Sequence, residues 1–178
     1  MQAGEQGTRE AGRVRFQTVL RTLILLTAQD PATNRRAVLL LKGAPTKRLW
    51  ANRYNGLGGH VERGEDILDA ARRELAEEAG LHDVALSLRG VVTIDTGTDD
   101  AGPRPGVVFF VFTGAIAYQA IPASHEGTPE WVPLDALNDY PLLDDLYALI
   151  PLALGDGPVF YGSYRPRADG GLAYRFQA

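Results

Sequence analysis

The stretch from Gly59 to Leu81 concentrates glycines and glutamates at spacings that suit divalent-cation chemistry. At about 100° per residue, Glu74, Glu77 and Glu78 fall on one side of a helix. Like charges one turn apart destabilise a helix unless a cation or a set of hydrogen-bond donors compensates them. Mg²⁺ is a suitable compensator, because it binds one or two protein carboxylates and leaves its other positions to water and substrate phosphates. The spacing therefore predicts a magnesium-pyrophosphate site, with Mn²⁺ as an alternative ion.

These acids need a helix that is docked on a core, and the same stretch supplies an apolar face. Four small or aliphatic residues recur at helical spacing: Leu68, Ala71, Leu75 and Ala79. Asp66 is a suitable N-cap and Gly80 a suitable C-cap, so we expect a helix from about Asp66 to Ala79. The acids alone would also fit a solvated surface helix with loose ion pairs, but the complete pattern with its glycines favours a functional site.

Gly59 to Leu81 resembles the signature of the Nudix hydrolases, which cleave nucleoside diphosphates linked to another moiety, and every fixed position of that signature is filled. The resemblance implies an α/β fold, specifically an α/β/α sandwich around a mixed β-sheet, over most of the chain. Residues 1–14 mix charge, Gly and Gln without an apolar run. We therefore expect a flexible leader over 1–14 and a single domain over 15–178.

The same resemblance implies roles for individual residues. Glu74 and Glu78 would be metal ligands, Glu77 a ligand or a water-orienting group, and the Gly58 carbonyl a further ligand. Arg73 would take a direct part in catalysis or brace the loop through an ion pair with Glu65; the alternative is that the two form a surface pair with no part in catalysis.

Length, composition and charge are consistent with a single-domain enzyme that acts on small-molecule substrates. The chain has 178 residues with 45% apolar content, which suits one ordinary domain. Its net charge of −4 provides no basic field for a nucleic-acid polymer, and no cysteine is present for thiol chemistry or a cysteine zinc site. No secretory signal is evident, and the longest apolar runs are too short to span a membrane. We expect a cytoplasmic protein, monomeric or homodimeric, whose partner is a small nucleotide.

Apolar periodicity and turn residues predict the remaining elements. In chain order they are strands at 16–27, 37–42, 84–94, 107–117 and 130–133, a helix over 143–154, and strands at 159–164 and 172–176. The first two strands are expected to pair through a turn at 30–34, and the last two as another hairpin. The polar loop at 96–105 is expected to be mobile and to rim the pocket.

Substrate choice depends on residues outside the signature, and Asn55 is the first candidate. The approach to the motif, Arg53 to Gly59, resembles that of the oxidised-purine nucleoside triphosphatases of this family, in which an asparagine at this place bonds the base. An amide can donate and accept at once. The alternative is that Asn55 and Gly56 form a favoured turn pair.

Asp144 and Asp145 resemble an acid pair that reads the purine edge in the same subfamily. In a desolvated pocket the two carboxylates would raise each other's affinity for protons, so that one could donate and the other accept. Acids in a first helical turn, favoured by the macrodipole, are the alternative. The subfamily's stacking tryptophan is replaced by Leu142, with Tyr140 as the nearest aromatic residue, which weakens the substrate assignment.

Four other residues outside the signature are candidates for smaller roles. Glu126 matches the place of a further glutamate at the metal site of that subfamily, as an extra ligand or general base, or is an exposed loop acid. Trp131 is assigned to packing, and Lys42 and Lys47 contact phosphates or only water. An ADP-ribose, nucleotide-sugar or dinucleotide pyrophosphatase and a non-catalytic nucleotide sensor are the other functions considered.

Overall fold

A computed structural model describes residues 16–46, 50–100, 102–167 and 171–178, and its main element is an eight-stranded sheet in the order β10-β9-β4-β7-β1-β2-β3, with β8 also paired to β2. The strands are β1 (Thr18–Gln29), β2 (Arg36–Gly43), β3 (Tyr54–Asn55), β4 (Ser87–Ile94), β7 (Gly106–Ala115), β8 (Gly127–Pro133), β9 (Phe160–Pro166) and β10 (Leu172–Gln177). The β1–β7 and β4–β9 pairs are parallel and the others antiparallel, so the sheet is mixed. β1 is buried continuously from Thr22 to Ala28, as a central strand covered on both faces must be.

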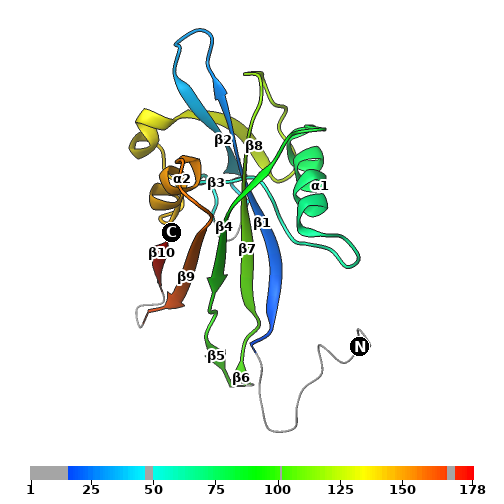
Figure 1. Cartoon of the computed structure of the whole chain (residues 1–178), viewed down its shortest axis with the longest axis vertical. Coiled ribbons are helices and arrows are strands. Elements are labelled where there is room, and N and C mark those ends of the chain that lie inside the picture. The colour runs from blue at the N-terminus through cyan, green and yellow to red at the C-terminus, as the bar shows by residue number, and fades with distance from the viewer. Residues whose placement is uncertain (1–15, 47–49, 101, 168–170) are drawn as a thin grey trace.

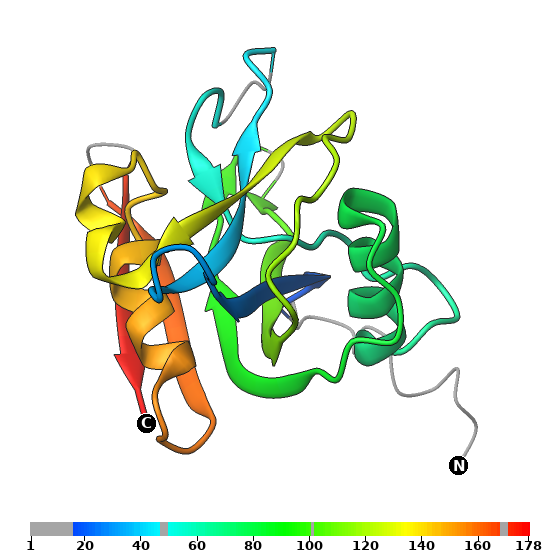
Figure 2. The ribbon, with the colours of Figure 1, turned by 90° about the horizontal axis from the view of Figure 1, so that it is seen from above.

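Helices cover both faces of this sheet. Helix α1 (Ile67–Ala79) packs on one face, and helix α2 (Leu146–Leu154) with the 3₁₀ segment η2 (Leu134–Asp139) packs on the other (Figures 1 and 2). Two apolar cores result. The α1-side core includes Ile24, Leu39 and Leu75, and the α2-side core includes Leu25, Leu149 and Phe160. The expected α/β/α sandwich is confirmed.

Helix α1 begins and ends where its capping residues predict. The Asp66 carboxylate accepts hydrogen bonds from the backbone N–H groups of Leu68 (2.8 Å) and Asp69 (2.9 Å). At the other end Gly80 takes a left-handed φ of 63°, which favours glycine. Leu75 in the middle of the apolar face is 1% exposed.

The β1–β2 hairpin is also confirmed, and its turn is built on Asp30. The Asp30 carboxylate accepts from the Ala32 N–H and the Thr33 hydroxyl, and Asn34 adopts φ 53°. The predicted closing hairpin corresponds to β9 and β10, which pair antiparallel.

Several bounds differ from the prediction, and the late helix differs most. Helix α2 begins at Leu146 rather than 143, because Leu142 and Leu143 pair with Tyr54: Leu142 forms a bridge to it, and the Leu143 N–H donates to its carbonyl. Strand β8 begins earlier than predicted, at Gly127, because its pairing with β2 extends to Gly43. Strand β4 begins only at Ser87, where its register with β7 starts.

The loop at 96–105 is not a plain loop. It carries a short antiparallel pair, β5 (Thr98–Asp99) with β6 (Gly102–Pro103). The predicted leader over 1–14 and Lys47 lie outside the described residues. Within the described chain, no helix is long and apolar enough to cross a membrane.

Candidate active site

A glycine turn brings the start of the motif against β1 and α1. The Thr22 N–H donates to the Gly59 carbonyl at 2.8 Å, which fixes the turn on the edge of β1. Gly58 has φ 117°, and a side chain there would also meet the Thr22 carbonyl oxygen at 2.5 Å. A side chain at Gly59 would collide with the carboxylate of Glu74. Gly58 is therefore required by its backbone conformation and by the close approach of β1, whereas a side chain at Gly59 would displace the Glu74 carboxylate from its place beside the turn.

Glu78 is the most deeply placed acid of the motif. Its side chain is on the inner side of α1, and the residue is only 7% exposed. The Gly58 N–H donates to its Oε2 at 2.7 Å. A buried carboxylate costs free energy unless it is hydrogen-bonded or paired, so the glycine turn and the helix depend on each other at this contact.

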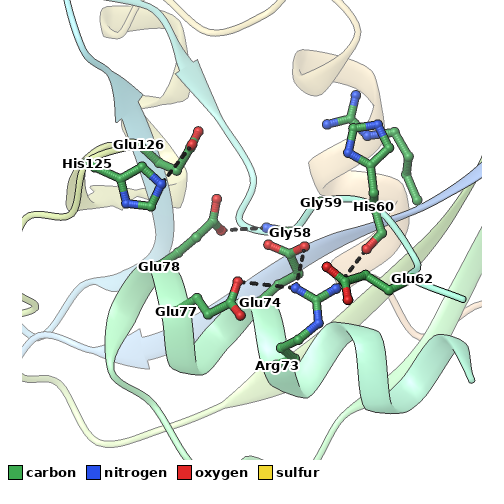
Figure 3. A pocket seen from close by; sticks show the side chains of 11 residues that line it. Gly58, Gly59, His60, Glu62, Arg73, Glu74, Glu77, Glu78, His125 and Glu126 are labelled. Carbon is green, nitrogen blue, oxygen red and sulfur yellow. Dashed lines mark hydrogen bonds and ion pairs between the residues drawn. The ribbon is translucent and has the colours of Figure 1, made fainter. Parts of the chain in front are cut away.

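Arg73 connects most of the motif. Its guanidinium pairs with Glu74 (3.0 Å) and Glu77 (3.2 Å), and it donates to the His60 carbonyl at 2.8 Å (Figure 3). It also pairs with Glu65 at 2.9 Å. The predicted ion pair with Glu65 is confirmed. The Arg73 guanidinium and the Glu62 N–H lower the pKa of Glu65. In turn, the Glu65 and Glu74 carboxylates raise the pKa of Arg73. Arg73 thus compensates the acidic edge of the helix.

Glu74 differs from Glu65 in spite of their shared partner. Burial raises the pKa of Glu74, with a further raising contribution from the charge of Glu77, and this outweighs the lowering by Arg73. Its side chain is 12% exposed. Ionised Glu74 therefore costs free energy in this position. A bound cation would lower that cost, because an opposite charge nearby favours the charged carboxylate.

The acids surround a cavity of about 430 Å³. Carboxylates of the motif lie on one side, and Glu126 with its neighbour His125 lies across from them (Figure 3). The Nε2 of His125 is 3.3 Å from the Glu126 carboxylate. The full lining is Arg21, Gly58, Gly59, His60, Glu62, Arg73, Glu74, Glu77, Glu78, His125 and Glu126. All the motif acids predicted to act on metal and water are thus brought together with Glu126.

Four residues of this lining were not predicted from the sequence: Arg21, His60, Glu62 and His125. Arg21 and His60 face each other as a bridge between β1 and the glycine turn, a pairing without a local sequence signal. Arg21 adds a guanidinium and His60 an imidazole to a lining that is rich in carboxylates. Such groups suit the phosphates of a substrate.

The donor chemistry of the cavity fits a hard divalent cation. Its acidic lining offers carboxylate oxygens and no sulfur, which is the set that Mg²⁺ prefers. As the side chains stand in the described residues, no three acids or histidines converge on one point. The reason is visible in the contacts: Arg73 holds Glu74 and Glu77, and Gly58 holds Glu78.

The other predicted residues form a separate cluster. The Tyr54 N–H donates to the Pro141 carbonyl and the Leu143 N–H to the Tyr54 carbonyl, so residues 53–55 run beside 141–144. This pairing brings the segment of Asn55 beside the segment of Asp144 and Asp145. None of these three residues lines the cavity formed by the glutamates of the motif. The Asn55 Oδ1 accepts from the Gly56 N–H at 2.9 Å, as in a turn pair.

The two adjacent acids have different partners. Asp144 has an 85% exposed side chain and pairs with Arg53 at 2.5 Å. Asp145 accepts a hydrogen bond from the Tyr164 hydroxyl at 2.7 Å. The expectation of a desolvated pair sharing protons is wrong for Asp144, because it is exposed and already neutralised. Nor do the acids lie inside the first helical turn: Asp145 is the N-cap residue of α2, without a side-chain capping bond.

Two further predictions concern residues on β2 and β8. Lys42 is 3.8 Å from Glu130 and lies over the Tyr54 ring at 5.6 Å, and the Tyr54 hydroxyl donates to Glu130. Burial and Glu130 raise the pKa of Tyr54. Trp131 packs on the α1-side core, where its ring stacks on another aromatic side chain, so its assignment to packing is confirmed.

The loop at 96–105 does not rim the cavity. None of its described residues contributes to the lining, and its two short strands extend from the end of the sheet opposite the β1–β2 hairpin (Figure 1). The prediction that this polar loop rims the pocket is therefore wrong, because β4 (Ser87–Ile94) and β7 (Gly106–Ala115) place the loop at that end of the sheet.

An α/β/α sandwich that holds a glutamate-rich helix under a glycine turn defines a hydrolase of the Nudix class. The model of the NUDIX domain matches residues 20–152 of this chain. The chain belongs to the Nudix family and is a Nudix pyrophosphohydrolase. Members of this family generally use a divalent metal.

Two curated relatives are oxidised purine nucleoside triphosphate hydrolases. The mouse protein (Mus musculus) is 31% identical over 115 residues, and the zebrafish protein (Danio rerio) is 33% identical over 127 residues. Each alignment covers 65% of this chain and 71% of the relative.

Solved structures share the fold at lower identity. The MutT protein of Bacillus halodurans superimposes with a TM-score of 0.70 and 23% identity, over 89% of this chain and 97% of that one. The NUDIX domain of Shewanella oneidensis NrtR, solved with ADP ribose, gives a TM-score of 0.64 and 20% identity, over 86% and 97%. These likenesses support the fold alone.

Proposed function

We propose that this protein is a magnesium-dependent pyrophosphohydrolase of purine nucleoside triphosphates, oxidised purines in particular, which releases the nucleoside monophosphate and pyrophosphate. The observation that carries the proposal is the cavity that Glu74, Glu77 and Glu78 of α1 line together with Glu126. The similarity to two oxidised purine nucleoside triphosphate hydrolases supports the substrate class.

Glu74, Glu78 and the Gly58 carbonyl would hold the metal, with Glu77 and Glu126 as further ligands. Mg²⁺, or Mn²⁺ in its place, supplies positive charge against the charge that develops on the phosphate oxygens. Arg73 keeps the glutamates on one edge of α1 through the ion pairs described above.

The chain's own residues must also activate the attacking water. Glu126 or Glu77 accepts a proton from a water molecule that attacks a phosphorus of the anhydride link, and the bond to the leaving pyrophosphate breaks. A base acts at about 2.6–3.2 Å from that water. Glu126 suits this role because it lies across the cavity from the glutamates of α1.

Base recognition is proposed for the cluster around the segments 53–55 and 141–145, which contains Asn55, Asp144 and Asp145; the contributions of the two acids to it are distinguished below. Because the Asn55 oxygen is bound to Gly56, its amide N–H groups are the part that would contact a base. Leu142 is fully buried, so it does not replace the stacking tryptophan of similar enzymes. Tyr140, packed edge-on against Tyr54, is the nearest candidate for that contact.

Hydrolysis of ADP-ribose, or of another nucleotide sugar or dinucleotide, is the second candidate. It is kept as a candidate because a NUDIX domain of the same fold was solved in complex with ADP ribose. A non-catalytic sensor is disfavoured, because all three glutamates of α1 are present in the cavity. We also propose a cytoplasmic monomer or homodimer that acts on the free nucleotide pool.

A substrate panel tests the proposal. Formation of the nucleoside monophosphate is measured by chromatography, with and without Mg²⁺, on 8-oxo-dGTP, 2-hydroxy-dATP, ordinary dNTPs and ADP-ribose, because every one of these substrates releases a monophosphate when its anhydride link is hydrolysed. We expect Mg²⁺-dependent turnover with the highest kcat/KM on an oxidised purine triphosphate. A preference for ADP-ribose would transfer the assignment to the second candidate, and absence of metal-dependent turnover on every substrate would revive the sensor.

A further inference from the structure

We propose that Tyr164 is a positioning residue for base selection, which holds Asp145 as a hydrogen-bond acceptor and so directs the enzyme toward purines whose recognised edge presents N–H donors. This inference rests on the proposed function, because it assigns different roles to the members of the base-recognition cluster. Asp145 would contact the base, whereas Asp144 would tie the neighbouring segments together.

The Tyr164 hydroxyl is fixed by the packing of its ring. Tyr164 is 4% exposed, on strand β9. Its ring packs against Phe109, Tyr174 and Phe176, with centroid separations of 5.8, 5.8 and 6.0 Å. A ring enclosed on three sides by other rings has little freedom to turn away. The hydroxyl therefore stays where it meets Asp145, at 2.7 Å from Oδ2.

The side chain of Asp145 does not cap helix α2, although Asp145 is its N-cap residue. An aspartate at the N-cap of a helix usually accepts bonds from the first backbone N–H groups, but the side chain of Asp145 makes no such bond to α2. Tyr164 holds one carboxylate oxygen instead. Asp145 is also less exposed than its neighbour Asp144. Of the two acids, it is the one whose orientation is set by a buried partner.

Asp144 is committed to a structural contact. Arg53 donates to its carboxylate at 2.5 Å and, from the same nitrogen, to the Leu142 carbonyl at 2.6 Å. These bonds join the segment before the glycine turn to the segment before α2. With its side chain 85% exposed, Asp144 lies in high-dielectric surroundings in which it can contribute little discrimination between bases.

The donor role of Tyr164 determines what Asp145 can recognise. Burial and the Asp145 carboxylate raise the pKa of Tyr164, so the phenol keeps its proton. The Asp145 carboxylate is therefore the acceptor in this contact, and an ionised carboxylate has only acceptor sites to offer a base. A guanine-type edge offers N–H donors at N1 and N2 to such a group. An adenine-type edge keeps a donor at N6 but offers a lone pair at N1, which a fixed acceptor repels, so one of the two hydrogen bonds is lost.

Two triphosphates that share the 8-oxo group and differ in this edge provide the test. We expect wild type to favour 8-oxo-dGTP over 8-oxo-dATP in kcat/KM by at least about tenfold, the effect of one lost or opposed hydrogen bond to a charged group. Tyr164→Phe removes only the hydroxyl and should reduce that ratio several-fold. Tyr147→Phe is the matched control. It removes a part-buried hydroxyl bound to the Tyr140 carbonyl and the Leu142 N–H, with no acid involved, and should leave the ratio unchanged.

A double-mutant cycle separates positioning from general loosening of the fold. If Tyr164 acts through Asp145, Tyr164→Phe should not alter the ratio further in an Asp145→Asn background. Asp145→Asn by itself should lower the ratio as Tyr164→Phe does, which tests the inference even if Tyr164→Phe does not fold. Equal loss on both triphosphates, or an effect of Tyr164→Phe that persists in the Asp145→Asn background, would overturn it. No hydrolysis of either triphosphate would overturn the proposed function as well, whereas hydrolysis of both without preference would overturn this inference alone.

Discussion

The carboxylate cavity and the base-recognition cluster are built in opposite ways. Most of the cavity comes from one continuous stretch, in which a glycine turn and a single helix supply Gly58, Glu74 and Glu78. The cluster around Asp145 joins three segments that are far apart in the sequence: 53–55, 140–145 and β9. The first depends on helix geometry and the second on the pairing of distant backbone.

This difference separates two kinds of function. Charges on one helix edge can be brought to a phosphate with little help from the rest of the fold, so they are expected to set the rate on every substrate. The base-recognition cluster, by contrast, can be altered by a substitution in any of the three segments that form it. Substrate choice should therefore be adjustable without loss of catalysis, and four predictions test this separation.

The largest effect is expected at the buried acid of α1. Glu78→Gln keeps the size of the side chain and removes its charge, so turnover should fall at least about 100-fold, more than the cost of losing an outer-shell partner of a metal. The loss should be similar on all substrates, and circular dichroism should show an unchanged fold. Near wild-type activity would remove Glu78 from the proposed metal site.

Loss of the guanidinium fork that joins four groups should have the next largest effect. Arg73→Lys retains one positive charge but cannot bind Glu65, Glu74 and Glu77 together. We expect activity to fall about 10–100-fold, as for an outer-shell partner, and the free energy of unfolding to fall by about 1–3 kcal/mol. Urea unfolding and steady-state kinetics measure both.

Arg72→Lys is the matched control for this variant. Arg72 is the neighbour on the same helix, its side chain is half-exposed, and it lies 3.6 Å from Asp69. It should behave as wild type in both measurements. If the two lysine variants lose the same activity, the loss does not come from the contacts of Arg73.

A smaller effect is expected at the exposed member of the acid pair. Asp144→Asn breaks the ion pair with Arg53, which as an exposed pair contributes about 0–1 kcal/mol. Thermal unfolding should change little, and the ratio of kcat/KM for the two 8-oxo triphosphates should stay within about twofold of wild type, less than the change for Asp145→Asn. A larger change for Asp144→Asn would reverse the roles of the two acids.

The smallest effect concerns stability as a function of pH. Burial raises the pKa of Glu74 in the folded protein, so its ionisation costs stability as pH rises above the unfolded value of about 4.3. Without metal, Glu74→Gln should therefore gain melting temperature relative to wild type between about pH 4 and pH 7. Differential scanning fluorimetry in EDTA measures this. A relative loss over the same range would mean that Arg73, and not burial, determines the charge of Glu74.

Local chemistry explains why the cavity could largely be predicted from the sequence. The caps Asp66 and Gly80, the apolar stripe and the three glutamates all act within one helix, and the structure places them as expected. Glu126 was found only through resemblance to known enzymes. Arg21 and His60 were missed, because their pairing across β1 has no signal in either segment alone.

The other cluster shows why the rest could not be predicted. The predicted start of α2 was wrong because Leu142 and Leu143 pair with the backbone of Tyr54 and do not begin the helix. The partners of the two acids, Arg53 and Tyr164, are 91 and 19 residues away from them. Such contacts depend on tertiary register, which periodicity and composition do not contain.

One comparison of variants tests the separation most directly: kcat/KM of wild type, Glu78→Gln and Asp145→Asn on 8-oxo-dGTP and 8-oxo-dATP, each with and without Mg²⁺. We predict that Glu78→Gln loses activity on both triphosphates by the same factor and keeps their ratio. Asp145→Asn should keep its dependence on Mg²⁺ and lose the preference for 8-oxo-dGTP. The account would be contradicted if Glu78→Gln changed the ratio, or if Asp145→Asn reduced both rates equally and left the ratio intact.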